Sequence, residues 1–214
     1  MQKTGRLELT WVGKYNETVI EPRILLEDKS KSYGDPRNEN MLIHGDNLIA
    51  LQALQQDYAG RIKCIFIDPP YNTGAAFEHY DDNVEHSTWL SLMKSRLVLL
   101  HQLLSDNGTL FIQIDDNEQA YLKVLCDEIF GRQNYINMVS VNAKVSAGAS
   151  GGGEDKRLKK NIEYILIYAK DINNFEPFHP VYKKTELMAY IQRMKEDNKS
   201  FKYTTVLYLS LIHI

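Results

Sequence analysis

Short apolar runs alternate with amphipathic helical patterns between residues 41 and 170, and this alternation restricts the fold more than any other feature of the chain. Ile62–Ile67 is a nearly continuous apolar run, as expected of a strand that is covered on both faces. Residues 109–114 predict a second buried strand of the same kind. An order of strand, helix and strand with right-handed crossovers predicts a doubly wound α/β sheet.

The remaining predicted elements fit this order. We expect further strands and helices at 41–44, near 135–141 and near 162–168 (strands), and at 47–56, 87–104 and 118–130 (helices). The helix at 47–56 has leucines at helical spacing, and Asp46 or Asn47 is suited to cap its first turn. Trp89, on the apolar side of the helix at 87–104, is more typical of a core residue than of a ligand contact.

Polar residues follow three of the predicted strands directly. Asp46 comes after the first strand, Asp68 after the second, and Asp115 with Asp116 after the strand at 109–114. Because α/β sheets bind ligands at the carboxyl ends of their strands, these residues mark one candidate site. For Asp115 and Asp116, the pattern favours residues that end a strand and cap a helix, and a role in lining the site is the second interpretation.

The strongest candidate for chemistry is the run Asp68, Pro69, Pro70 and Tyr71. Two consecutive prolines remove two backbone donors and hold the chain extended, so that a carboxylate, main-chain carbonyls and an aromatic ring stay close together. Such a group can accept both hydrogens of an exocyclic amine, on Asp68 and on the Pro69 carbonyl, which frees the nitrogen lone pair to attack a methyl sulfonium. Tyr71 would stack on a base that has left the duplex. The alternative is a strand-ending turn with an aspartate cap and a core tyrosine.

Residues 64–74, which contain these four, resemble the catalytic motif of amino-methyltransferases that act on DNA. Further segments resemble the modification subunits of type III restriction–modification systems; they lie at 9–14, 21–25, 43–48, 114–118 and 163–170. The resemblance extends over residues 7–205, and its motifs are specific in combination.

This resemblance implies a Rossmann-like methyltransferase sheet, S-adenosylmethionine as the methyl donor and N6-methyladenine as the product. It implies that Asp68 and Tyr71 contact a flipped adenine in double-stranded DNA, with Pro69 and Pro70 between them. It also puts Asp46 beside the adenosine of the cofactor, although a helix cap explains that residue equally well. The protein partners that it implies are a restriction subunit with helicase and nuclease activity and a second modification subunit.

The chain departs from the family in one respect. Members of this permuted class carry a glycine-rich methyl-donor motif after the target-recognition region, and the sequence contains none. The glycine-rich residues 148–153 have no helix after them and fail the phosphate-loop pattern, so we interpret them as a flexible loop between two strands. We therefore expect an incomplete sheet in permuted order, with its C-terminal part missing.

The domain prediction has four parts. We expect an N-terminal arm and linker at 1–40, a partial catalytic domain at 41–175, the start of a target-recognition region at 176–208 and a non-native tail at 209–214.

Residues beyond the proline run supply further binding candidates. Asn72, Phe77 and Tyr80 are candidates for the base pocket, with loop packing as the equal alternative for the two aromatic residues. Lys156 and Arg157 either contact DNA phosphates or belong to a solvated basic loop. The histidines lack metal-ligand spacing, so no metal site is predicted.

Composition restricts the partners and the compartment. The net charge of −3 is uneven, with −7 in residues 1–138 and +4 in residues 139–214, which is compatible with DNA binding by the distal part. The sequence has neither an apolar run of the ~18–20 residues that a membrane span requires nor a signal peptide. We expect a cytoplasmic protein in which Cys64 and Cys126 are buried, reduced thiols.

The leading hypothesis is a site-specific adenine-N6 DNA methyltransferase of a restriction–modification system. Cytosine-N4 methylation is the nearest rival reaction, although serine is more usual than aspartate before Pro-Pro-Tyr in those enzymes. A catalytically inert, truncated fragment is the competing hypothesis from another class of function.

Overall fold

The computed structural model describes ten stretches of the chain, namely residues 8–16, 21, 23–35, 37, 40–72, 76–77, 80–81, 85–143, 162–179 and 186–197. The chain divides into two compact units, residues 1–176 and 177–214. The described part of the second unit contains helix α4 (Leu187–Glu196). The first unit contains the sheet and the three other α-helices of the described residues. The roles predicted for the four parts of the chain (arm and linker, catalytic domain, target-recognition region and non-native tail) stay predictions.

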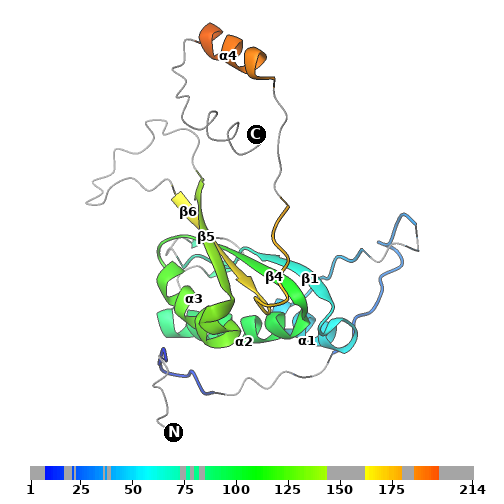
Figure 1. Cartoon of the computed structure of the whole chain (residues 1–214). Coiled ribbons are helices and arrows are strands. Elements are labelled where there is room, and N and C mark those ends of the chain that lie inside the picture. Colours follow the sequence, from blue (N-terminus) through cyan, green and yellow to red (C-terminus); the bar gives the residue numbers. More distant parts are fainter. Residues whose placement is uncertain are drawn as a thin grey trace. The chain divides into compact units, whose positions relative to one another are not determined.

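The sheet has four strands in the order β1-β4-β6-β5 (Figure 1). β1 (Ile62–Ile67) pairs parallel with β4 (Leu104–Ile114), and β6 (Ile162–Ala169) pairs antiparallel with both β4 and β5 (Tyr135–Asn142). β4 begins before residue 109 because Leu104 already pairs with Ile62, and residues 105–108 bulge out of the ladder. The structure is therefore an α/β fold with a mixed sheet, and the strands expected near 135–141 and 162–168 are confirmed.

Three α-helices lie on the same side of this sheet (Figure 1). They are α1 (Asn47–Tyr58), α2 (His86–Leu103) and α3 (Gln119–Cys126), and α3 continues into a π-helical turn, η1 (Asp127–Gly131), and a 3₁₀ turn, η2 (Arg132–Asn134). All three predicted helices are thus present. Within the described residues, none of the helices combines the length and the apolar character needed to cross a membrane.

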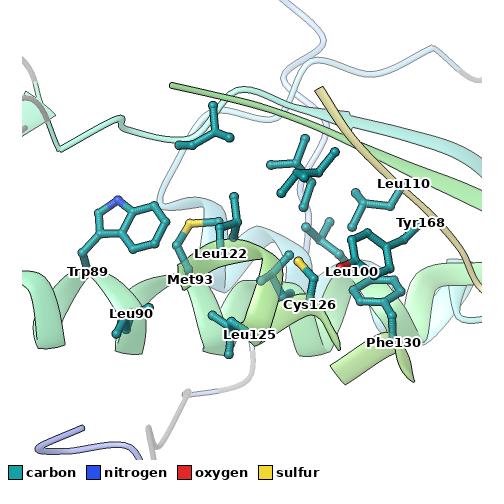
Figure 2. Packing of buried hydrophobic residues seen from close by; sticks show 14 of the residues in the cluster. Trp89, Leu90, Met93, Leu100, Leu110, Leu122, Leu125, Cys126, Phe130 and Tyr168 are labelled. Carbon is teal, nitrogen blue, oxygen red and sulfur yellow. The ribbon is translucent and has the colours of Figure 1, made fainter. Parts of the chain in front are cut away.

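The core lies between the sheet and these helices. Alternate residues of β4, Leu110, Ile112 and Ile114, are fully buried and face the apolar sides of α2 and α3. Figure 2 shows Met93 of α2 beside Leu122 of α3 in this cluster. Each fully buried leucine or isoleucine side chain stabilises the fold by about 1.5–3 kcal/mol relative to its exposed state, so this layer supplies much of the folding free energy.

The opposite face of the sheet, here called the bare face, is open at β1, although Ile167 of β6 is only 7% exposed on that face. This corrects the prediction that β1 is covered on both faces. On β1, Ile65 and Ile67 pack against the core, whereas Phe66 between them is 57% exposed and Cys64 is exposed. The reason is the position of β1 at the sheet edge, with the described helices on one side only. The expectation that Cys64 is buried is wrong; Cys126 is free and buried, as predicted.

Residues 41–44 do not form the predicted strand. Met41 is 52% exposed and Leu42 is 99% exposed, so the segment lacks a packing surface as well as a ladder. A short run becomes a strand only where a neighbouring strand satisfies its backbone groups, and the described residues offer none beside it.

Residues 9–15 of the N-terminal arm are bound to the helices by hydrogen bonds and an ion pair. The side chain of Lys14 is only 5% exposed, and its ammonium group donates to Glu128 Oε2 of η1 at 2.8 Å. Trp11 Nε1 donates to Ser91 Oγ of α2 at 2.8 Å. Because a buried cation is costly unless it is paired, the contact between Lys14 and Glu128 fixes where residues 9–15 lie on the helices.

Candidate active site at the end of strand β1

Residues 68–72, here called the tip segment, follow β1 directly at the carboxyl end of the strand. β4 runs parallel to β1, so Asp115, which follows β4, lies at the same edge of the sheet. Asp115 is buried, and its carboxylate accepts hydrogen bonds from the backbone and side-chain amides of Asn117. This places Asp115 in a strand-ending turn, the structural role that the sequence pattern favours.

The hydroxyl of Tyr71 is held from the bare face of the sheet. It donates to Glu163 Oε2 of β6 at 3.1 Å, and Gln113 Nε2 of β4 donates to the same oxygen at 2.7 Å. Burial raises the pKa of Tyr71 above its ordinary value, and the neighbouring charge of Asp68 and the hydrogen bond to Glu163 act in the same direction. The phenol therefore stays protonated at neutral pH and remains a hydrogen-bond donor.

The carbonyl of Pro70 is held from the helical side. Trp89 Nε1 of α2 donates to it at 2.8 Å, and Trp89 itself is 1% exposed. The prediction that Trp89 is a core residue is confirmed, and its indole N–H fixes the tip segment in addition. Because the prolines supply no backbone N–H, contacts to their carbonyls are the direct means of fixing this stretch.

Asn72 ends the tip segment in a left-handed backbone conformation, with φ of 58°. Its side-chain amide donates to Glu118 Oε1 at 2.7 Å. The side chain of Glu118 is 5% exposed, and His86 Nδ1 lies 2.9 Å from its carboxylate. Few residues other than glycine adopt this backbone region, and asparagine is among those that tolerate it best. The buried Glu118 thus stabilises the turn by which the chain leaves the site.

These contacts leave the first half of the tip segment open. The side chain of Asp68 is exposed, and its carboxylate lies close enough to the Tyr71 hydroxyl to interact with it. Among the described residues no donor reaches the Pro69 carbonyl. An exposed carboxylate oxygen and a main-chain carbonyl oxygen are both acceptors, so together they suit a ligand group with two hydrogens to donate. The tip segment therefore joins two open acceptors to an aromatic ring that is fixed by its hydroxyl.

Asp46 is the N-cap of α1. Its Oδ1 accepts from the backbone amides of Leu48 at 2.9 Å and Ile49 at 3.2 Å, while Oδ2 lies 3.9 Å from Arg96 Nη2. The capping role, one of two that the sequence left open, is thus observed. The side chain remains 56% exposed, and its contact with a cofactor stays a prediction.

The other predicted site residues are less completely described. Phe77 and Tyr80 are paired with each other in a hairpin of two short strands, β2 (Ala76–Phe77) and β3 (Tyr80–Asp81). The structure describes their backbone but not their side chains. Lys156, Arg157 and the glycine-rich residues 148–153 lie outside the described residues.

Sequence reasoning missed the side chains that hold the tip segment from outside it. These side chains are Gln113, Glu118 and Glu163, and they come from three separate parts of the chain. Glu118 is 46 residues from its partner Asn72, and Glu163 is 92 residues from its partner Tyr71. One signal was available. Glu163 is a charged residue inside the otherwise apolar strand β6, and a carboxylate in such a strand needs a partner.

Comparison with known proteins gives three findings. The sequence model of the DNA methylase family matches residues 62–210. The chain is 47% identical over 181 residues to the probable type III restriction-modification enzyme HindVI Mod subunit of Haemophilus influenzae, a match that covers 85% of this chain and 24% of that protein. It is 34% identical over 222 residues to the type III StyLTI Mod subunit of Salmonella typhimurium, covering 88% and 32%. The chain spans about a quarter to a third of the length of these relatives.

Among solved structures, the M1.HpyAVI–SAM complex aligns with a TM-score of 0.45 at 16% identity. That alignment covers 68% of this chain and 61% of the other.

Proposed function

Because this chain belongs to the DNA methylase family, we propose that the protein methylates the N6 amine of adenine in DNA as the modification component of a type III restriction–modification system. The proposal concerns the whole protein, since the chain spans 24% and 32% of the two Mod subunits it resembles. The observation that carries it is the tip segment, where the open acceptors of Asp68 and Pro69 stand beside the fixed ring of Tyr71.

The two open acceptors have a definite role in this reaction. The lone pair of the adenine amine is delocalised into the ring, so the nitrogen is a poor nucleophile. Asp68 accepts one N–H and the Pro69 carbonyl accepts the other, which favours a pyramidal nitrogen with its lone pair directed away from the ring. This interaction strengthens as the amine becomes tetrahedral, so it lowers the barrier rather than merely binding the base.

Tyr71 receives the base after it leaves the duplex. Flipping costs a few kcal/mol, and stacking on an aromatic ring contributes about 1–3 kcal/mol per base. Because two prolines precede the ring and Glu163 holds its hydroxyl, the stacking surface is formed before the base arrives.

S-adenosylmethionine is the methyl donor in this proposal, and it supplies an electrophilic methyl group on a sulfonium. The Asp46 side chain fits one part of that molecule, because it is 56% exposed and its Oδ2 takes no part in capping α1. A carboxylate oxygen in this position can accept hydrogen bonds from ribose hydroxyls. Gly45, next to it, has no atoms within 4 Å of the place a side chain would occupy, so there is room beside the carboxylate.

We further propose that the sheet is a Rossmann-like methyltransferase sheet in permuted order, completed by strands and a glycine-rich donor motif that these 214 residues do not include. Two observations support this. β1 carries an exposed Phe66 at an unpaired edge, and residues 41–44 have strand-like sequence without a described strand beside them. A strand beside β1 would pair with its edge and with residues 41–44, and a helix connecting such strands would cover Phe66.

Double-stranded DNA with a flipped adenine is the proposed substrate. A restriction subunit and a second modification subunit are the proposed protein partners in the cytoplasm. In this proposal Phe77 and Tyr80, from the hairpin that follows the tip segment in sequence, line the base pocket. Lys156 and Arg157 contact the DNA phosphates. Asn72 contributes through the turn that it forms with Glu118.

The test is the substitution Asp68→Ala in the longest form of the protein that the gene encodes, assayed with tritiated S-adenosylmethionine and duplex DNA. We expect methyl transfer to fall by at least about 100-fold, because an interaction made in the transition state is lost. DNA affinity should change little. Asp57→Ala, which removes an exposed carboxylate at the end of α1, is the matched control and should retain full activity.

Three results would contradict the proposal. Unchanged turnover of Asp68→Ala would remove Asp68 from the site. Tritium on cytosine rather than adenine would identify N4 methylation. A longest encoded form that folds but transfers no methyl group would show that the protein is not an active methyltransferase.

A further inference from the structure

We propose that Glu163 is a positioning residue that fixes the ring plane of Tyr71, and that this contact determines how well the tip segment accepts a planar base. The role rests on the proposed function, because a fixed ring matters only if a base stacks on it. The contact itself is the 3.1 Å hydrogen bond from the Tyr71 hydroxyl to Glu163 Oε2.

Glu163 is the second residue of β6, where it lies opposite Val141 of β5. From Tyr164 onward, β6 is paired with β4 as well. Gln113 of β4 lies opposite Ile165, two residues further along β6, so the side chains of Gln113 and Glu163 project from the same face. Gln113 donates to the oxygen that accepts from Tyr71, so the carboxylate is held from β4 as well as by the tyrosine.

The ring of Tyr71 packs against the core cluster, and the hydrogen bond at its hydroxyl adds a fixed point at the far end of the ring. An aromatic side chain has two rotatable bonds, and anchoring the hydroxyl at the far end of the ring restricts both. A ring fixed in advance does not lose that freedom when a base stacks on it, and this makes binding stronger. A charged acceptor makes a stronger hydrogen bond than a neutral one, which explains a carboxylate at this position.

The chemistry at the hydroxyl agrees with this role. Burial, together with the charge of Asp68 and the hydrogen bond to Glu163, raises the pKa of Tyr71 above its ordinary value. The hydroxyl therefore keeps its proton at neutral pH and remains the donor in this hydrogen bond.

The first experiment measures the order of the Tyr71 ring in the 214-residue chain by carbon-13 relaxation of labelled tyrosine. The signal among the 13 tyrosines is identified by its disappearance in Tyr71→Phe. We expect the order parameter of the ring to fall in Glu163→Ala to a value typical of mobile side chains and to be retained largely in Glu163→Gln, which keeps an acceptor. Glu176→Ala, which removes a carboxylate that is 76% exposed, is the control and should leave the signal unchanged.

An unchanged ring order in Glu163→Ala overturns the proposal. Should that variant fail to fold, as judged by circular dichroism, Tyr71→Phe observed with labelled phenylalanine removes the same hydrogen bond from the other side. A phenylalanine ring as ordered as the tyrosine ring would then overturn it.

The second experiment measures kcat and KM for methyl transfer in the longest encoded form. We expect Glu163→Ala and Tyr71→Phe each to lower kcat/KM by about tenfold, and the double variant to lose about tenfold rather than a hundredfold, since both remove one hydrogen bond. Additive losses would overturn the positioning role. If the wild-type protein transfers no methyl group, the proposed function fails, while the ring-order experiment still decides whether Glu163 holds Tyr71.

Discussion

The two faces of the sheet are built on different principles. The face toward α1, α2 and α3 is apolar and closed, with Leu110 and Ile112 fully buried. The other face carries Phe66 at 57% exposure and the polar pair Gln113 and Glu163. The closed face accounts for the stability of the unit, and the bare face contributes one of the contacts that shape the site.

The tip segment is contacted from both sides of the sheet. Trp89 and Glu118 hold it from the helical side, and Glu163 holds it from the bare side. Neither set of contacts involves Asp68 as an acceptor from a distant element. The comparison teaches that the contacts from distant elements fall on the second half of the tip segment, Pro70 to Asn72, whereas the acceptors of Asp68 and Pro69 precede them.

The cysteines test this difference directly, because each reports on one face. Cys64 is exposed on β1, whereas Cys126 is fully buried in α3, where burial raises the pKa of its thiol. In the folded chain we expect an aromatic disulfide reagent to modify Cys64 at least about 10³-fold faster than Cys126, since Cys126 reacts only after the core opens. Stopped-flow absorbance with the variants Cys64→Ser and Cys126→Ser measures the two rates separately.

Equal rates for the two thiols would show that the helical layer opens readily and would end the distinction between the faces. The same reagent also tests the proposed completion of the sheet. In the longest encoded form, strands beside β1 should protect Cys64, and continued fast reaction of Cys64 there would argue against that arrangement.

A second comparison measures the free energy of unfolding after an apolar side chain is truncated on each face. Leu110→Ala removes a fully buried side chain from the closed face and should lower the free energy of unfolding by about 2–5 kcal/mol. Phe66→Ala removes a larger side chain from the bare face and should lower it by less than about 1 kcal/mol in this chain. Urea unfolding followed by circular dichroism gives both values.

Similar costs for the two variants would mean that the bare face is covered by residues outside the described ones. A cost of Phe66→Ala that rises in the longest encoded form would instead place further structure on β1.

Much of the fold was predictable because it depends on local pattern. The apolar run of β1, the helical spacing of α2 and the cap at Asp46 all involve residues near one another in sequence, and each is found as expected. The membership of the DNA methylase family, inferred from short motifs, is confirmed. The position of Asp68 at a strand end followed from the order of elements alone.

What sequence reasoning missed depends on distant partners. An apolar run has the same sequence pattern whether one face of the strand or both are covered. The exposure of the Phe66 side chain could therefore not be predicted from the sequence of β1. The segment at 41–44 has strand-like residues, but a strand also needs a neighbour. The hydrogen bond between Tyr71 and Glu163 joins residues 92 apart. The charge of Glu163 inside β6 signals that this residue needs a partner, but no local pattern identifies Tyr71 as that partner.

The smallest effect concerns the backbone at the end of the tip segment, where φ of Asn72 is 58°. Asn72→Ala and Asn72→Gly both remove the hydrogen bond to Glu118, so the difference between them isolates the backbone. Glycine adopts this conformation without steric penalty, and we expect it to be the more stable of the two by about 1 kcal/mol. Thermal unfolding of the two variants side by side measures the difference. An alanine variant as stable as the glycine variant would show that the turn relaxes when Glu118 is released, and that the hydrogen bond from the helical side, rather than the chain itself, imposes the left-handed conformation.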